Sequence, residues 1–379
     1  MKQSYTTWRN YLLNTDIPFS DKAWTVYRHQ LEHQPVYRRF CDEIPGKQHP
    51  LTGSESPSFP DDIPLIPVHV FRDASVRADY VETPEAVFQS SGTSGMRQSK
   101  HEMADLRLYF ESCYGGFSHF YDPGEFVLLA WLPGYSDNPD SSLVAMIDHF
   151  IQRDATGKSR FLPLDKPLTK ADLNSAANMD TVAYLNKRRY RRRASLGNMP
   201  YQSSGKVAVE PGKTGDKPGK KRRIMLFGAA FGLLDLLDAG APALPEDAIL
   251  VETGGMKTRR KELSKQDLRQ QLSEGFGIPP GSVHSEYGMA EMSSQAWDTG
   301  DGWLQCPPWL RITIRNPQNP MEVQSAGEEG LIGIMDLANV HSVAFFLTED
   351  RGVAREDGAF QVLGRMEHAE LRGCNFLME

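Results

Sequence analysis

Cysteine is scarce in this sequence, and its spacing excludes the kinds of site that depend on it. The 379 residues contain four cysteines that lie far apart and form no Cys-X-X-Cys pair: Cys41, Cys113, Cys306 and Cys374. A disulfide framework or a zinc site is therefore not expected. Reduced thiols in a cytoplasmic protein are the expectation.

Long apolar runs and an excess of positive charge are also missing. The most apolar stretch, residues 224–237, is too short to span a membrane and contains Asp235. The first residues lack the apolar core of a signal peptide. With 42 Lys and Arg against 49 Asp and Glu, the formal net charge is −7, whereas nucleic-acid binding needs a positive field. We expect a soluble protein without a membrane span or a nucleic-acid partner.

What the chain does contain is an alternation of short apolar runs and amphipathic stretches. The apolar runs predict strands at residues 126–132, 224–227 and 249–251. Helical spacing predicts helices in residues 1–45 and at 103–120, 141–151, 231–237 and 264–276, and Ser20 is a candidate cap for the second helix. Such alternation favours an α/β fold, with a sheet covered by helices and ligand loops at the strand ends.

One segment differs in kind from the rest. Residues 187–223 are rich in Lys, Arg, Gly and Pro, a composition that predicts a mobile basic insertion. Within it, Gly212-Lys213-Thr214 has the appearance of the end of a P-loop. The motif requires glycine where the chain has Val207, and an apolar strand before it, which is absent. A Walker A site is therefore excluded.

The most informative stretch is residues 86–95. Apolar Ala86 to Phe88 lead into a run of small residues: Ser90, Ser91, Gly92, Thr93, Ser94 and Gly95. Glycines let backbone N–H groups converge on one point and hydroxyls add donors, which suits an anion such as phosphate. An ordinary surface turn of Ser and Gly is the alternative interpretation.

Three later stretches also carry groups suited to a ligand. Tyr287 beside Gly288 offers a flat face for a purine ring, and Glu291 is an oxygen ligand suited to Mg²⁺; a polar loop with a packed tyrosine is the alternative. Asp350 follows the apolar run 343–347, and a carboxylate at the end of a strand can hold both hydroxyls of a ribose, although Asp-Arg-Gly is also a common turn. Arg365 follows a further strand and can reach phosphate or ribose.

In order and spacing, these four stretches resemble the acyl-adenylate-forming superfamily, which includes acyl-CoA synthetases and phenylacetate–CoA ligases. The resemblance implies the large α/β adenylation-type domain, with ATP and Mg²⁺ as cofactors. The implied nucleotide-binding residues are Ser90, Ser91, Gly92, Thr93, Ser94, Gly95, Gly254, Gly255, Tyr287, Gly288, Ala290 and Asp350. Glu291 is then the metal ligand, and Arg365 lies in the hinge motif.

Within this group the chain is most similar to acyl-protein synthetases of the LuxE type. The similarity is carried by residues 90–95, 252–257, 284–291, 306–309, 336–339, 348–350 and 371–375. It implies that the enzyme activates a fatty or other carboxylic acid as acyl-AMP and transfers the acyl group to Cys374. Delivery to a partner follows, either an acyl reductase or a protein of the acyl-carrier type. The implied division is a core at 1–347 and a hinge and tail at 348–379.

Two departures from the family pattern keep alternatives open. The usual small C-terminal domain is shortened to a tail, and Lys265 is the last lysine. Lys257 or Arg365 is therefore the candidate for catalytic charge stabilisation. The phosphate loop also lacks its usual proline and lysine, for which Arg97 or Lys100 can substitute. The alternative functions are an ATP-independent acyltransferase between thioester carriers and a non-catalytic nucleotide-binding subunit.

Overall fold

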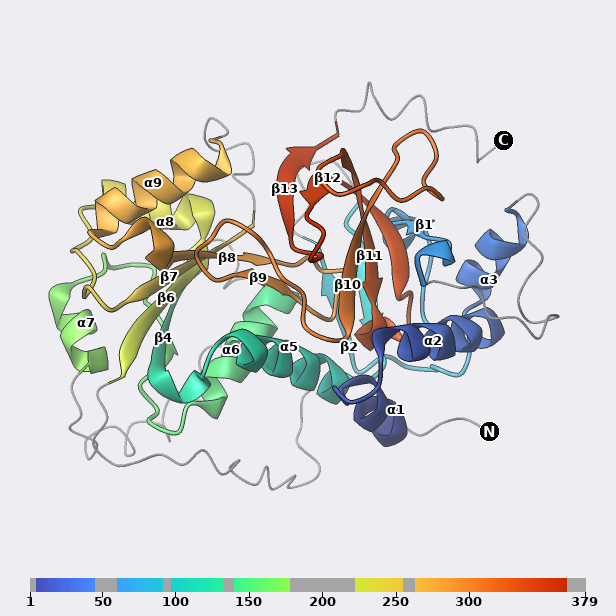
Figure 1. Cartoon of the computed structure of the whole chain (residues 1–379). Coiled ribbons are helices and arrows are strands. Elements are labelled where there is room, and N and C mark those ends of the chain that lie inside the picture. The colour runs from blue at the N-terminus through green and yellow to red at the C-terminus, as the bar shows by residue number, and fades with distance from the viewer. Residues whose placement is uncertain are drawn as a thin grey trace. The chain divides into compact units, whose positions relative to one another are not determined.

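The structure is a computed structural model that describes residues 5–44, 60–90, 97–132, 140–177, 222–254 and 263–366 (Figure 1). It divides into two compact units. The first comprises residues 1–120, 140–142 and 286–379, and the second comprises 121–139 and 143–285. The predicted basic insertion lies outside the described residues up to position 221.

A five-stranded sheet forms the centre of the first unit as described. Its order is β1-β12-β11-β10, with β13 paired to β12; β1 is parallel to β12 and the other pairs are antiparallel. The strands are β1 (Ile66–Pro67), β10 (Leu310–Arg315), β11 (Glu329–Asp336), β12 (Phe345–Ala354) and β13 (Phe360–Arg365). A short strand, β9 (Ala296–Asp298), precedes β10.

Strand β12 corrects one expectation from the sequence. The prediction that a strand ends just before Asp350 is wrong, because β12 continues for four more residues. The antiparallel partner β13 extends the ladder and pairs Arg365 with Asp350. Pairing with a strand distant in sequence thus overrides the local turn preference of Asp-Arg-Gly. The predicted boundary between 347 and 348 falls inside this strand and stays a prediction.

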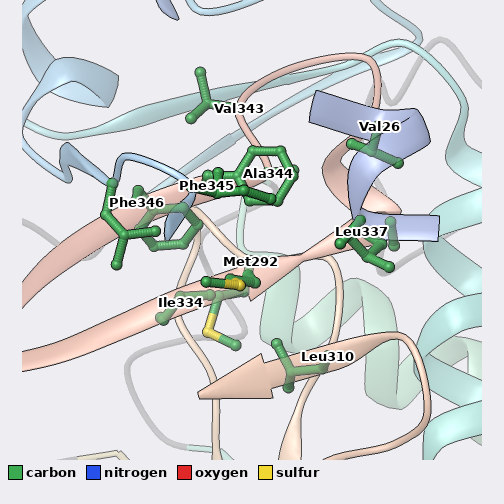
Figure 2. Packing of buried hydrophobic residues seen from close by; sticks show 14 of the residues in the cluster. Val26, Met292, Leu310, Ile334, Leu337, Val343, Ala344, Phe345 and Phe346 are labelled. Carbon is green, nitrogen blue, oxygen red and sulfur yellow. The ribbon is translucent and has the colours of Figure 1, made fainter. Parts of the chain in front are cut away.

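Helices of the first unit supply much of the apolar core. They are α1 (Tyr5–Leu12), α2 (Phe19–His33), α3 (Pro35–Asp42), α4 (Val70–Asp73) and α5 (Leu106–Phe120). Trp24, Tyr27 and Leu31 recur at helical spacing on α2 and are all buried. Figure 2 shows Val26 of the same helix beside Leu337, within the cluster that includes Phe345 and Phe346.

The predicted cap of α2 is wrong. The helix begins at Phe19 with Pro18 in the cap position, so Ser20 lies inside the first turn, where Asp21 also lies as expected. Proline fixes a backbone angle that suits the start of a helix and has no N–H of its own to satisfy.

A hairpin in the first unit presents the Ser/Gly loop. Strands β2 (Ala86–Gln89) and β3 (Lys100–Met103) pair antiparallel, with Phe88 opposite His101. A strand therefore leads into the loop, and Phe88 alone of its apolar residues is fully buried. Residues 91–96 lie outside the description.

The second unit is built on parallel strands. The sheet order is β5-β4-β6-β7-β8, and β4, β5, β6 and β7 are parallel. The strands are β4 (Phe126–Trp131), β5 (Arg160–Phe161), β6 (Arg223–Ala229), β7 (Ile249–Thr253) and β8 (Val283–Tyr287), which leads back into the first unit. The helices are α6 (Ser142–Arg153), α7 (Lys170–Ala177), α8 (Ala230–Asp238) and α9 (Lys265–Phe276).

The predicted α/β alternation is confirmed in this unit. Every residue of β4 and β7 is buried, as expected for parallel strands covered on both faces. Helix α9 begins at its Ser264 cap, whose hydroxyl accepts from the N–H of Asp267 at 3.0 Å, and ends at Gly277 with φ of 65°. None of the helices in the described part of the chain has the length and apolar character that a membrane crossing needs.

Candidate functional site

Three of the predicted site residues of the first unit meet at one carboxylate. The Tyr287 hydroxyl donates to Oδ2 of Asp350 at 2.9 Å, and Nε of Arg365 donates to Oδ1 at 3.3 Å. The backbone N–H of Asp350 donates to Oγ1 of Thr348 at 3.1 Å. Cross-strand pairing of residues 350 and 365 produces this arrangement, since neighbouring strands place paired side chains side by side.

The surroundings of Asp350 differ on its two sides. Burial raises the pKa of its carboxyl group, and the Arg365 charge and the Tyr287 hydroxyl counteract part of that rise. Burial likewise raises the pKa of Tyr287 well above its ordinary value. The side chain of Arg365 is 78% exposed and that of Asp350 13%. The carboxylate therefore lies at the rim of the unit, with a buried phenol on one oxygen and a solvent-facing guanidinium on the other.

Glu291, the predicted metal ligand, is buried nearby. Burial raises the pKa of its carboxyl group, and a hydrogen bond with the Ser99 side chain and the Arg365 charge counteract part of the rise. Among the described residues, no group of three or more His, Cys, Asp or Glu side chains is placed to hold a metal ion. A single carboxylate still fits Mg²⁺ that is shared with substrate phosphates, because this ion keeps several waters and uses few protein ligands.

Ser90 lies at the base of the predicted phosphate loop. Its hydroxyl accepts from the N–H of Ser99 at 3.0 Å, and its own N–H donates to the Ser99 carbonyl at 3.1 Å. Ser99 thus pairs with Ser90 across the base of the loop, and its side chain also forms a hydrogen bond with the Glu291 carboxyl group. The hairpin thereby brings the base of this loop to the predicted metal ligand. Ser91, Gly92, Thr93, Ser94 and Gly95 lie outside the described residues.

Gly288 and Ala290 shape the turn between Tyr287 and Glu291. A Cβ atom at Gly288 would lie 2.5 Å from Oε1 of Glu286, so a larger residue here would require the buried Glu286 side chain to shift. The role of Gly288 beside a purine base stays a prediction. The Ala290 carbonyl lies 3.0 Å from Nδ1 of the buried His101.

A buried polar network holds the segment that follows Glu291, and it was not predicted as part of the site. The Asp336 carboxylate accepts from the N–H groups of Ser293 and Ser294 at 2.7 and 2.8 Å, and from the N–H of Ala338 at 3.1 Å. Burial raises its pKa to about 6. Nδ2 of Asn339 donates to the Glu291 carbonyl at 2.8 Å.

Two sequence signals could have indicated this network. Asp336 directly follows the apolar run 331–335, and a carboxylate at the end of such a run is suited to cap a turn, as Asp336 does for the 3₁₀ helix Leu337–Asn339. Ser99 and His101 follow the Ser/Gly loop, where the returning strand of a hairpin would be expected.

The remaining predicted residues lie elsewhere. Gly254 belongs to the second unit, where its φ of 73° turns the chain at the end of β7. Two residues earlier, Glu252 is buried and accepts from Nζ of Lys265 and Oγ of Ser285, each at 2.6 Å. Gly255, Lys257 and Cys374 lie outside the described residues.

The described cysteines are poor nucleophiles. Burial raises the pKa of Cys113, whose thiol donates to the Ser293 carbonyl at 3.6 Å, and raises that of Cys306 to about 12. Cys41 is buried as well. Thiolates carry the nucleophilic chemistry of cysteine, and these environments suppress them. Cys113 thus belongs to the buried core.

Solved structures show where this fold occurs. An open conformation of 2-hydroxyisobutyryl-CoA ligase, in complex with 2-HIB-AMP and CoA, matches with a TM-score of 0.55 and 16% identity over 92% of this chain and 69% of that chain. A postadenylation state of the ligase with 2-HIB-AMP gives a TM-score of 0.54, with 16% identity over 91% of this chain and 66% of that chain. The predicted adenylation-type α/β fold is confirmed.

Sequence comparisons agree with the family expectation. A curated relative, the long-chain-fatty-acid–luciferin-component ligase of Vibrio harveyi, is 22% identical over 140 residues, or 35% of this chain. The match spans only 37% of that protein's length. Residues 235–379 match the model of the family described as acyl-protein synthetase, LuxE. The predicted resemblance to LuxE-type acyl-protein synthetases is therefore confirmed over this C-terminal part of the chain.

Proposed function

We propose that the chain is an acyl-protein synthetase that uses ATP to activate a fatty or other carboxylic acid and then transfers the acyl group to Cys374. The observation that carries the proposal is the cluster of Tyr287, Asp350 and Arg365, three residues that the family resemblance assigns to nucleotide binding and the hinge. They lie in the part of the chain that matches the LuxE family model.

The residues of the first unit suggest how the reactants are held. Ser90 and the loop after it bind the phosphates, the Tyr287 ring lies against the adenine, and Asp350 binds the ribose hydroxyls. Glu291 would hold Mg²⁺, which when bound neutralises charge on the phosphates. Arg365 is exposed and borders the carboxylate, so it is placed to stabilise negative charge that develops during activation.

The chemistry proceeds in two balanced steps. A carboxylate oxygen of the acid attacks the α-phosphorus of ATP, so that acyl-AMP forms and pyrophosphate leaves. The Cys374 thiolate, after losing its proton to solvent or a base, attacks the acyl carbon, so that a thioester forms and AMP leaves. The acyl group then passes to an acyl reductase or a carrier-type partner protein.

Two measurements test this function. Incubation with ATP and a radiolabelled fatty acid should label the wild-type protein and leave Cys374→Ser unlabelled, with Cys306→Ser as the matched control that keeps the label. No label on the wild type, or an unchanged label on Cys374→Ser, would contradict the cysteine step.

ATP–pyrophosphate exchange tests the activation step separately. Exchange is expected with at least one member of a panel of acids of graded chain length. Acyl transfer from a thioester carrier without any exchange would instead establish the ATP-independent acyltransferase. ATP binding without any acyl product would instead support the alternative of a non-catalytic nucleotide-binding subunit.

A further inference from the structure

His101 joins two parts of the candidate site that are distant in sequence. It lies on β3, the returning strand of the hairpin that presents the Ser/Gly loop, directly opposite Phe88. Its ring is 1% exposed. Nδ1 lies 3.0 Å from the Ala290 carbonyl, and Nε2 lies 2.8 Å from Oγ of Ser342.

These partners fix the tautomer of His101. A carbonyl oxygen can only accept, so Nδ1 must carry the proton and donate it to Ala290. Nε2 of the neutral ring is then the acceptor, and the Ser342 hydroxyl donates to it. The histidine is therefore hydrogen-bonded through both nitrogens. Turning the ring over would put carbon atoms where the nitrogens now lie, and both hydrogen bonds would be lost.

His101 and Asn339 both hydrogen-bond the backbone at Glu291 and at the residue before it. Asn339 donates from Nδ2 to the Glu291 carbonyl at 2.8 Å, and its own carbonyl lies 3.3 Å from Oγ of Ser342. Successive carbonyls, those of Ala290 and Glu291, are thus held by side chains from two different elements. The backbone that carries the Glu291 carboxylate has little freedom to rotate as long as both contacts remain.

We propose that His101 is a positioning residue for Glu291 and that it makes the phosphate-loop hairpin and the metal-ligand loop move as one body. A shift of β3 on phosphate binding is passed through Nδ1 to Ala290 and so to the carboxylate next to it. This inference rests on the proposed function, because it assigns His101 to the binding of ATP together with Mg²⁺.

Matched substitutions of His101 test the hydrogen bonds of its two ring nitrogens separately. His101→Asn places an amide donor near the position of Nδ1, whereas His101→Gln places its amide near Nε2, and His101→Leu removes both contacts. Loss of one buried hydrogen bond corresponds to about tenfold in a binding constant. We therefore expect His101→Leu and His101→Gln to weaken ATP binding about tenfold in the presence of Mg²⁺, with His101→Asn within about threefold of wild type.

Titration calorimetry with ATP, with and without Mg²⁺, measures the ATP affinity of each variant. Thermal unfolding measures the stability of each variant. ATP binding without Mg²⁺ should change far less, because the metal ligand is then not engaged. Ser273→Ala is the control: it also removes one buried hydrogen bond, the 2.7 Å contact with the Ile278 carbonyl, and lies in the second unit. It should lower the melting temperature without altering ATP affinity.

The outcomes separate this inference from the proposed function. Wild-type affinity in His101→Leu, or equal losses in His101→Asn and His101→Leu, would overturn the positioning role while the function stands. A wild-type protein that binds no ATP would overturn both. Should His101→Leu not fold, Ser342→Ala releases Nε2 alone and is expected to weaken Mg²⁺-dependent ATP binding by about threefold, and an unchanged affinity would again overturn the role.

Discussion

The two units bury polar groups in different ways. In the described part of the second unit, fully buried polar side chains are scattered around an apolar core of parallel strands and helices: Ser159, Glu252, Thr253, Ser273 and His284. In the first unit they form connected networks. Asp336 alone takes three backbone N–H groups and the Ser294 hydroxyl.

The difference indicates which unit depends on specific hydrogen bonds for the geometry of its loops. A buried polar group is costly unless it is bonded, so a satisfied network stabilises one backbone geometry over its neighbours. Apolar packing is less selective and accepts other side chains of similar volume. We therefore expect the first unit to depend on particular atoms and the second on filled volume.

The largest effect is expected where the network is anchored. Asp336→Ala leaves four buried donors without their acceptor and should lower the free energy of unfolding by about 3–5 kcal/mol. Ser273→Ala in the second unit removes one hydrogen bond, to the Ile278 carbonyl at 2.7 Å, and should cost about 1 kcal/mol. Urea unfolding of both variants measures the difference. Equal losses would break the comparison.

A core leucine tests the second unit. Leu250 is fully buried on β7, and Leu250→Ala should cost about 2–4 kcal/mol through the cavity that it leaves. Leu250→Met keeps the volume and should cost less than about 1.5 kcal/mol. Asp336→Asn also keeps the volume but replaces an acceptor oxygen with a donor, so it should exceed that cost. A well-tolerated Asp336→Asn would show that volume, not atom type, matters in both units.

The smallest effect is a pH dependence of stability that is expected from buried histidines in both units. Burial lowers the pKa of His284 in the second unit to about 4 and that of His341 in the first to about 3. At these two histidines the unfolded chain binds more protons at acid pH, so their contribution to stability is largest above about pH 6.5 and declines as the pH falls toward 4. His33, Asp79 and Arg9 surround the cluster of His29 and His341, and Arg223 and Arg269 face His284.

Thermal unfolding at pH 7 and pH 4.5 measures this decline. His341→Gln and His284→Gln should each flatten it slightly. A pH dependence that is the same in both variants as in the wild type would contradict the assignment.

The sequence predicted the elements well where a local pattern determines them. The helical spacing of Trp24, Tyr27 and Leu31 predicted α2, and the unbroken apolar run 126–132 predicted β4. The extension of β12 past Asp350 was not predictable, because it depends on pairing with β13, and local turn chemistry pointed the other way.

The site was predictable in part for the same reason. Tyr287, Asp350 and Arg365 were identified from motifs, and the structure brings them together. His101 and Asp336 were missed as site residues because their role lies in contacts with Ala290 and Ser293, far away in sequence. The local sequence marks the positions of these residues but not the distant groups that they contact. The roles assigned to Lys257 and Cys374 stay predictions.

The pairing of Asp350 with two partners has a consequence for how any ligand would enter. Each carboxylate oxygen accepts one of these hydrogen bonds and has a second lone pair, so a ligand either shares the carboxylate with Tyr287 and Arg365 or replaces one of them. The exposed guanidinium of Arg365 can return to water at little cost, whereas the buried hydroxyl of Tyr287 would be left without an acceptor. A diol that leaves the Tyr287 contact in place and replaces only that of Arg365 would therefore bind best.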